Sequence, residues 1–180
     1  MGRRSSTQII IPSLNQNQGV ALAVFNNHPQ YALNSTFDVF NFVNELNDVE
    51  LIHKPLEDNI SGYIEKQGEK FIIAINSSQN PLRQRFTLAH ELGHYYIHRS
   101  ELSGQHTDVT LFRDANEDRL GIEYAANDFA AELLMPELNF RQAIKEGNNT
   151  PKHLSQLFQV TEKAVLYRAY KLGFLKTFQP

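Results

Sequence analysis

The segment His90-Glu91-Leu92-Gly93-His94 constrains this chain more than any other feature of its sequence. An α-helix has 3.6 residues per turn, so two imidazoles four residues apart project from nearly the same side and can reach one metal ion. Glu91 is rotated about a quarter turn from His90, which keeps its carboxylate off the metal but beside it. There it can take a proton from an attacking water. Two neutral ligands and a neighbouring base are what metal-assisted amide hydrolysis requires.

Composition narrows the choice of metal ligands. The 180 residues contain no cysteine, so a metal must be held by His, Asp or Glu, and disulfides and thiol nucleophiles are excluded. The formal net charge of -3 gives no whole-chain reason to expect binding to nucleic acid or to an anionic membrane. Pro12 breaks the apolar run near the N-terminus, and no segment approaches transmembrane length. We therefore expect a cytoplasmic protein with no membrane partner.

The chain divides into three predicted parts. Residues 1–34 form an N-terminal extension, of which residues 1–30 are rich in Asn, Gln and Ser and are interpreted as a partly ordered segment or an edge strand. Residues 35–147 form the zinc-binding core that contains the motif, and residues 148–180 form a helical C-terminal module. Together they predict an α+β fold, in which a small β-sheet or hairpin packs on the helix that carries the motif.

Capping residues and hydrophobic spacing place the elements of this fold. Asn80 followed by Pro81 predicts the start of the motif helix, which we extend to His98. Apolar residues at helical spacing predict further helices at 37–46, 117–135, 138–145, 151–158 and 161–172. Short apolar runs predict strands at 49–53, 63–65 and 71–75, the last two joined as a hairpin. The polar span 99–116 is interpreted as a functional loop.

The third metal ligand must come from another segment, and we choose Glu123. In the helix that ends at residue 135, Glu123 lies at the edge of the apolar sector, whereas Asp128 and Glu132 are placed on the solvent side. A carboxylate beside a buried face is costly unless something compensates it, and a cation does so. The alanines of this helix also allow it to approach its neighbour closely. The simpler interpretation of Glu123 is a surface acid in a first helical turn.

Other residues near the motif are less well supported as metal ligands or catalytic residues. His98 is an alternative ligand, but it lacks the spacing of a three-histidine motif and is more simply a positive charge at a helix C-terminus. His106 and Asp108 fall in the predicted loop and bind substrate or have no role. Asn127 is interpreted as a residue that braces the site rather than a ligand. No residue is assigned to stabilise an oxyanion.

Two segments resemble a known family. Residues 86–94 (FTLAHELGH) and residues 123–136 (EYAANDFAAELLMP) are similar to motifs of the ImmA/IrrE metallopeptidases, and the two together are far more specific than the first alone. The resemblance covers about residues 35–178. It implies that His90, His94 and Glu123 bind one Zn²⁺ per chain, with Mn²⁺ or another divalent ion as the alternative. It also implies that the neighbouring glutamate is the catalytic base.

The resemblance further implies a substrate. Members of this family are typically bacterial or phage-encoded and are often paired with an Xre-like helix-turn-helix repressor. They inactivate the repressor by one site-specific cut, which switches on stress or mobile-element genes. We accordingly expect a zinc-dependent endopeptidase that cleaves such a repressor, with Glu91 as its catalytic residue. The alternative is a non-proteolytic anti-repressor, in which the metal is structural or regulatory.

The C-terminal module resembles a helix-turn-helix, with Thr161 as the cap of its second helix. Its basic residues are Lys152, Lys163, Arg168, Lys171 and Lys176. Against one acid this is a modest excess, and a phosphate-binding surface needs a clustered basic face. We therefore favour a packing or substrate-docking module and do not expect direct nucleic-acid binding. A DNA-binding regulator is the third interpretation.

Overall fold

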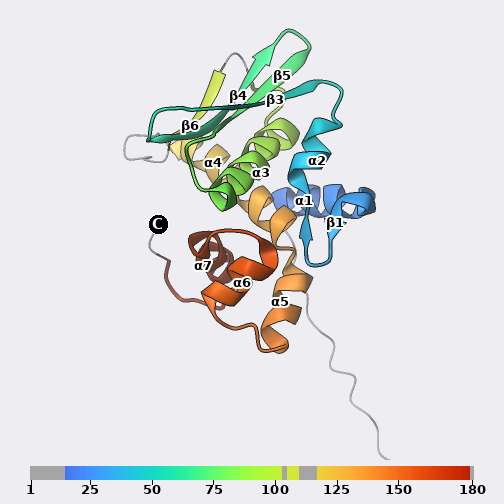
Figure 1. Ribbon diagram of the computed structural model, residues 1–180, viewed down its shortest axis with the longest axis vertical. Coiled ribbons are helices and arrows are strands. Elements are labelled where there is room, and N and C mark those ends of the chain that lie inside the picture. Colours follow the sequence, from blue (N-terminus) through green and yellow to red (C-terminus); the bar gives the residue numbers. More distant parts are fainter. Residues whose placement is uncertain (1–14, 103–104, 110–116, 179–180) are drawn as a thin grey trace, which may run out of the picture.

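The computed structural model describes the backbone of residues 15–102, 105–109 and 117–178, and the side chains of these residues except 105–109 and 117–119. A small β-sheet lies at one end, the C-terminal helices lie at the other, and two long helices lie between them (Figure 1). The predicted α+β class is therefore confirmed. None of the described helices is both long and apolar enough to span a lipid bilayer.

Four strands form the sheet, namely β3 (Val49–Lys54), β5 (Lys70–Asn76), β4 (Ile60–Gln67) and β6 (Gln105–Val109), in that order. β3 runs parallel to β5, whereas β4 is antiparallel to both of its neighbours. β4 and β5 are the predicted hairpin, which turns at Gly68 with a φ of +62° that favours glycine. Our interpretation of 99–116 as a loop is wrong for β6. A short polar edge strand has no apolar pattern of its own, because its pairing with β4 defines it.

The helix that carries the motif is α3 (Pro81–Ile97), and it begins as predicted. Asn80 caps its first turn by accepting a backbone hydrogen bond at 2.8 Å. At the other end, Asp48 accepts hydrogen bonds from Tyr95 Oη at 2.8 Å and from Arg99 at 2.6 Å. Burial raises the pKa of Asp48, but these hydrogen bonds outweigh burial and hold the pKa below its ordinary value. The start of α3 is thus capped within its own segment, and its end is tied to Asp48, the residue before β3.

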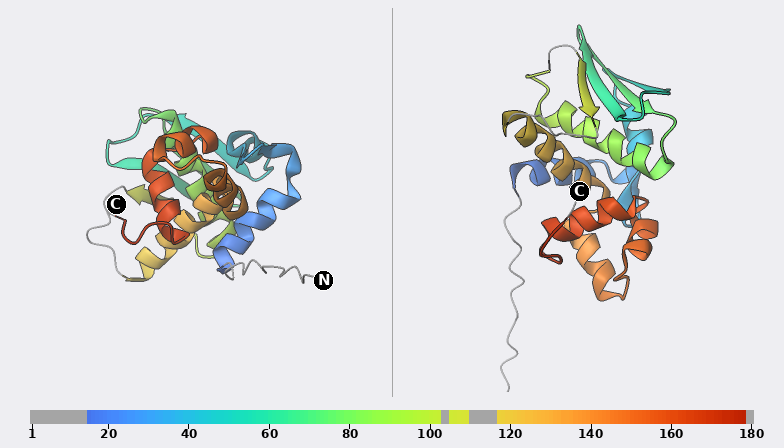
Figure 2. Two further views of the ribbon diagram at one scale, coloured as in Figure 1. Left: turned by 90° about the horizontal axis from the view of Figure 1, so that it is seen from below. Right: turned by 90° about the vertical axis from the view of Figure 1, so that its left-hand side faces the viewer.

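The second long helix, α4 (Glu117–Leu134), packs against α3 on the side away from the sheet (Figure 2). The two helices approach each other tightly at Gly93. A Cβ added there would lie 3.1 Å from both the Cα and the carbonyl oxygen of Ala126, and 3.2 Å from Phe129 Cβ. The close approach expected from the alanines of this helix is therefore confirmed, and it depends equally on a glycine of α3.

The N-terminal extension contains a helix, α1 (Gln16–Asn27), so our interpretation as a partly ordered segment or an edge strand is wrong for these residues. Asn15 accepts the Gln18 N–H at 2.9 Å, and the Gln18 side chain accepts the Asn15 N–H at 3.1 Å. This reciprocal capping box was readable in the sequence. Its apolar residues run consecutively from Val20 to Phe25 and so do not form a stripe along one face, and the helix packs against α4.

The segment that follows α1 contains several short elements, and the helix predicted at 37–46 is shorter than expected. It contains η1 (Pro29–Tyr31), β1 (Ala32–Leu33), β2 (Thr36–Phe37) and α2 (Val39–Asn44). Asp38 caps α2 by accepting the Asn41 N–H at 3.2 Å, so the helix starts after Phe37 instead of at it.

Three helices complete the chain: α5 (Glu137–Lys145), α6 (Pro151–Phe158) and α7 (Glu162–Lys171). Their bounds agree with the prediction to within about one residue, which is the usual uncertainty of helix ends. Gln159 adopts a left-handed φ of 53° between α6 and α7, at the turn position where glycine is usual. The Thr161 hydroxyl accepts the Ala164 N–H at 3.2 Å and caps α7 as predicted.

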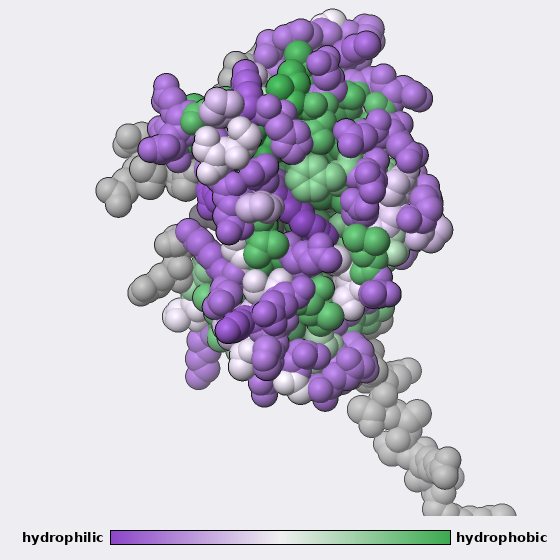
Figure 3. Space-filling model, in the orientation of Figure 1, coloured by the Kyte–Doolittle hydropathy of each residue, from purple (hydrophilic) through white to green (hydrophobic). Residues whose placement is uncertain are grey.

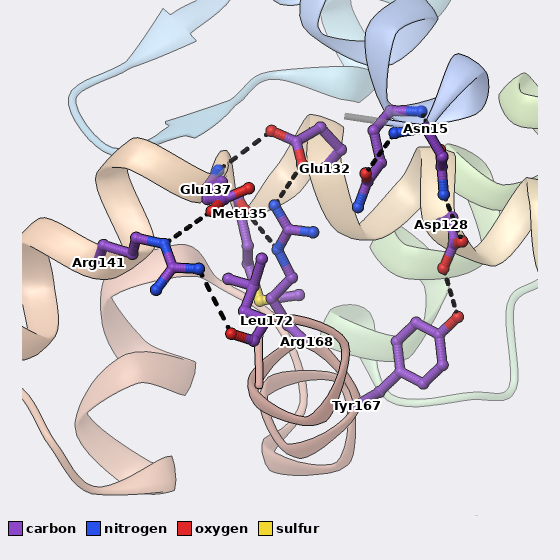
Figure 4. Close-up of polar contacts among 10 residues, drawn as sticks. Asn15, Asp128, Glu132, Met135, Glu137, Arg141, Tyr167, Arg168 and Leu172 are labelled. Atoms are coloured by element: carbon purple, nitrogen blue, oxygen red, sulfur yellow. Dashed lines mark hydrogen bonds and ion pairs between the residues drawn. The ribbon is translucent and has the colours of Figure 1, made fainter. Parts of the chain in front are cut away.

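A buried ion pair fastens α7 to the end of α4 (Figure 4). Arg168 is fully buried, donates to the Glu132 carboxylate, and donates through Nε to the Met135 carbonyl at 3.0 Å. Glu132 also accepts the Glu137 N–H at 3.1 Å. Our placement of Glu132 on the solvent side is therefore wrong. Arg168 is likewise unavailable as part of a basic surface, because its charge is neutralised inside the protein.

Asp128 joins three segments one turn earlier on α4 (Figure 4). It accepts hydrogen bonds from Tyr167 Oη at 2.7 Å and from Asn15 Nδ2 at 3.2 Å, and its carboxylate lies 2.9 Å from Lys171 Nζ. With 6% exposure, Asp128 also contradicts the predicted solvent-facing position. α4 has no solvent face here because α1, α3 and α7 all cover it.

Candidate metal centre

The structure brings His90 and His94 of α3 together with Glu123 of α4. The Nε2 atoms of the two histidines are 3.0 Å apart, and Glu123 Oε2 lies 3.1 Å from His90 Nε2 and 3.5 Å from His94 Nε2. All three side chains are buried. Within the described parts of the chain, no other three His, Asp or Glu residues offer ligand atoms that converge in this way.

These spacings fit a single small cation. Zinc bound tetrahedrally to imidazole nitrogen and carboxylate oxygen at about 2.0–2.2 Å places its ligand atoms about 3.3 Å from one another. The observed separations of 3.0, 3.1 and 3.5 Å bracket that value. Two nitrogens and one carboxylate oxygen also form the donor set of catalytic zinc sites, in which a fourth position stays open. The three residues therefore fit a divalent metal ion.

The outer nitrogen of each histidine meets a different partner. His90 Nδ1 lies 3.0 Å from Asn127 Oδ1. An amide oxygen only accepts, so His90 carries its proton on Nδ1 and leaves the Nε2 lone pair pointing toward Glu123. Asn127 therefore braces the site and does not contact its centre, as expected. His94 Nδ1 lies 3.2 Å from the Nδ1 of His98.

Glu91 is fully buried where α3 meets β4. A Cβ added to Gly62 of β4 would lie 3.4 Å from Glu91 Oε1, 2.7 Å from Thr87 Cγ2 and 2.8 Å from the Ala74 carbonyl oxygen. A side chain at position 62 would therefore clash with Thr87 and with the Ala74 carbonyl, so only glycine lets β4 pass this close to α3, where Glu91 is buried. Glu91 directly follows His90 in the chain, so its carboxylate is buried next to the candidate ligands.

Sequence reasoning missed the two glycines that make this geometry. Gly93 lies within the motif and sets the α3–α4 distance, while Gly62 sets the α3–β4 distance. An isolated glycine inside a strand pattern is a usable signal for close backbone approach. His98 does not join the three-residue cluster. The side chains of His106 and Asp108 lie outside the described residues.

Comparison with known proteins identifies the family. The model of the Peptidase_M78 family, the IrrE N-terminal-like domain, matches residues 45–170, a range that contains the whole cluster and Glu91. The chain belongs to this family. The predicted resemblance to ImmA/IrrE metallopeptidases is therefore confirmed.

Relatives of this Peptidase_M78 chain include two proteins with the name radiation response metalloprotease IrrE. The one from Deinococcus radiodurans is 36% identical over 107 residues, which is 58% of this chain and 31% of that protein. The one from Deinococcus deserti is 30% identical over 139 residues, or 76% of this chain and 47% of that protein. The chain therefore spans less than half the length of these two relatives.

A third relative is closer in length. Metallopeptidase ImmA of Bacillus subtilis is 26% identical over 141 residues, which is 74% of this chain and 78% of that protein. Among solved structures, a Mycobacterium tuberculosis transcriptional regulator superposes with a TM-score of 0.62 over 86% of this chain and 46% of that chain. At 15% identity, this likeness shows a shared fold.

Proposed function

We propose that this chain is a zinc-dependent endopeptidase, with His90, His94 and Glu123 as metal ligands and Glu91 as the catalytic base. The observation that carries the proposal is the convergence of three donor atoms, 3.0–3.5 Å apart, next to a fully buried glutamate. The family supports a divalent metal, and the donor set favours zinc. Mn²⁺ or another divalent ion is the alternative, since affinity alone does not select the metal used in a cell.

The residues around the site divide the chemistry among them. A divalent ion held there supplies Lewis acidity toward the scissile carbonyl and makes water more acidic. Glu91 accepts the proton of the attacking water on its carboxylate and returns it to the leaving amine. Burial against Gly62 limits the motion of that carboxylate. Asn127 keeps the proton of His90 on Nδ1, which leaves Nε2 unprotonated toward the site.

For the substrate, we propose an Xre-like helix-turn-helix repressor, cut at one position in the cytoplasm. The support for this substrate is the resemblance of the two motifs to the ImmA/IrrE family. We further propose that the substrate pairs in extended form with β6. In the described sheet, β6 is the edge strand next to β4, and β4 contacts Glu91 at Gly62. Backbone pairing at such an edge would hold a scissile bond still.

We propose that residues 35–147 form the catalytic core and that residues 148–180 form a packing or substrate-docking module. Of the five basic residues in this module, Arg168 is buried and Lys171 is paired with Asp128. On the face shown in Figure 3, the surface over the C-terminal helices mixes hydrophilic with apolar side chains, whereas a phosphate-binding surface needs a clustered basic face. The extension of residues 1–34 contributes α1, which packs on the core.

Glu91→Gln tests the proposal. The purified protein, loaded with Zn²⁺, is incubated with a purified Xre-like helix-turn-helix repressor from the same genome, and fragments are identified by mass spectrometry. We expect the variant to lose cleavage while it keeps its metal content and its binding to the repressor. Glu57→Gln, which makes the same change at an exposed glutamate, should cleave as the wild type does.

The same variant separates peptidase from anti-repressor. If Glu91→Gln relieves repression as fully as the wild type, binding alone is sufficient and the endopeptidase proposal fails. If it binds the repressor but does not relieve repression, hydrolysis is required.

A further inference from the structure

His98 ends α3 with its ring turned back onto His94 rather than outward. The two Nδ1 atoms are 3.2 Å apart, and the ring centroids are separated by 5.3 Å at an interplanar angle of 45°. His98 is only 8% exposed. The sequence predicted a positive charge at a helix C-terminus, and His98 does lie at the end of α3, but its ring is turned into the protein. The ring is buried against a histidine of the site.

The direction of this hydrogen bond follows from the other side of the His94 ring. Its Nε2 faces Glu123 and His90, so as a metal ligand it must be unprotonated there. A neutral imidazole has one N–H, which places the His94 proton on Nδ1. That N–H donates to His98 Nδ1, and His98 in turn carries its own proton on Nε2. In the same way, Asn127 Oδ1 accepts the Nδ1–H of His90.

We propose that His98 is a positioning residue of the metal centre, which accepts the His94 Nδ1–H and fixes the tautomer and orientation of that ligand. The proposal rests on the proposed function only in that His90, His94 and Glu123 bind a divalent ion. Partners of this kind on ligand histidines are usually carboxylates or carbonyls, and their loss weakens metal affinity by about 10–100-fold. Here a neutral histidine takes that position.

The geometry separates this role from that of a fourth ligand. His98 approaches the nitrogen of His94 that points away from Glu123, so the His94 ring lies between His98 and the converging atoms. The cluster of possible ligands in the described residues accordingly does not include His98.

The backbone of His98 is held independently of its side chain. Its N–H donates to the His94 carbonyl at 2.9 Å, and its carbonyl accepts from the N–H groups of Glu101 and Leu102 at 2.8 and 3.2 Å. These bonds remain when the side chain is replaced. A substitution at this position therefore removes the ring contact while leaving the turn that ends α3.

The test measures Zn²⁺ affinity of the full chain by competition with a chromophoric chelator, and the visible absorption of the Co²⁺ form as a signature of ligand geometry. We expect His98→Ala to weaken Zn²⁺ binding by about 10–100-fold and to alter the Co²⁺ spectrum. His98→Asn should restore most of the affinity, because its amide oxygen can accept where Nδ1 did. His153→Ala, at an exposed histidine of α6, should match the wild type.

Each outcome decides the proposal. Wild-type Zn²⁺ affinity in His98→Ala overturns the positioning role, as does a loss that His98→Asn fails to restore. Circular dichroism of the metal-free proteins reports folding, and if His98→Ala does not fold, His98→Leu, which fills the space without an acceptor, takes its place: weakened affinity that His98→Asn restores supports the proposal, and wild-type affinity in His98→Leu overturns it. If His94→Ala binds Zn²⁺ as tightly as the wild type, the metal centre itself fails, which is a separate result.

Discussion

Gly93→Ala probes how closely α3 and α4 must approach to bring Glu123 to the two histidines. In open space a glycine-to-alanine change inside a helix stabilises a protein by about 1 kcal/mol. At Gly93 the new Cβ would lie 3.1 Å from Ala126 backbone atoms, so the helices must separate by a few tenths of an ångström. Overpacking of this kind costs about 1–3 kcal/mol. The net change is a loss of about 0–2 kcal/mol.

The sharper readout is metal affinity. Glu123 lies three residues before Ala126 on α4, so a displacement of this helix moves its carboxylate away from the histidines of α3. We expect Zn²⁺ binding to weaken about 10-fold or more, as when supporting groups of a metal site are altered. Chelator competition measures this, and thermal unfolding of the metal-free protein measures stability, at about 2–4 °C per kcal/mol for a chain of this size.

Gly121→Ala is the matched control. Gly121 lies on α4, the helix that faces Gly93, but a Cβ added there meets nothing within 4 Å. This variant should gain about 0.5–1 kcal/mol and keep wild-type Zn²⁺ affinity. If Gly93→Ala gives the same gain with unchanged affinity, the helices do not constrain each other at this crossing and the reasoning is wrong.

Four further predictions follow from contacts elsewhere in the structure. Arg168→Met should destabilise the protein by about 3–5 kcal/mol in urea unfolding, because it leaves Glu132 charged and buried, and a loss below about 1 kcal/mol would contradict the buried ion pair. Chelation of the metal should lower stability by about 2.7 kcal/mol relative to a Zn²⁺ concentration 100 times the dissociation constant, and an unchanged melting temperature would argue against a bound ion. Hydrogen bonds lower the folded-state pKa of Asp48, so its carboxylate stabilises the protein fully above the unfolded-state pKa, and this contribution is lost as the pH falls below about 4. Asp48→Asn should therefore remove that part of the pH dependence of the unfolding free energy. An Asp48→Asn protein with the same pH dependence as the wild type would contradict this role of Asp48. Lys152→Gln combined with Lys163→Gln should leave retention on DNA unchanged, whereas a clear loss would revive the DNA-binding interpretation.

The parts of the site that were predictable are those set within a few residues of one another. A capping asparagine followed by proline marks the start of α3, and helical spacing then places His90 and His94 on one side with Glu91 beside them. These relations depend on backbone geometry alone, which is the same in any helix. The C-terminal helices were predictable for the same reason, since Thr161 and the positions around it carry their own capping signals.

Predictions of which helix residues face solvent were partly wrong, because they depend on what packs against the helix. The structure brings Glu123 to the histidines, but Asp128 and Glu132, assigned to solvent by the same periodicity, are buried against α1 and α7. The position of an apolar face predicts which residues are buried only when the helix is covered by protein on one side. Where ion pairs and hydrogen bonds satisfy the carboxylates, polar residues can face protein all round the helix.

The amino-acid sequence by itself therefore determined the motif helix and the relative positions of its two imidazoles and its glutamate. These positions follow from the repeat of 3.6 residues per turn, which involves only residues within four positions of one another. Tertiary structure alone decided how near α4 comes, through Gly93, and that β6 completes the sheet beside Gly62. It also decided that His98 turns inward onto His94. Each of these depends on contacts between segments distant in the chain or on the burial they create, and local periodicity carries no information about either.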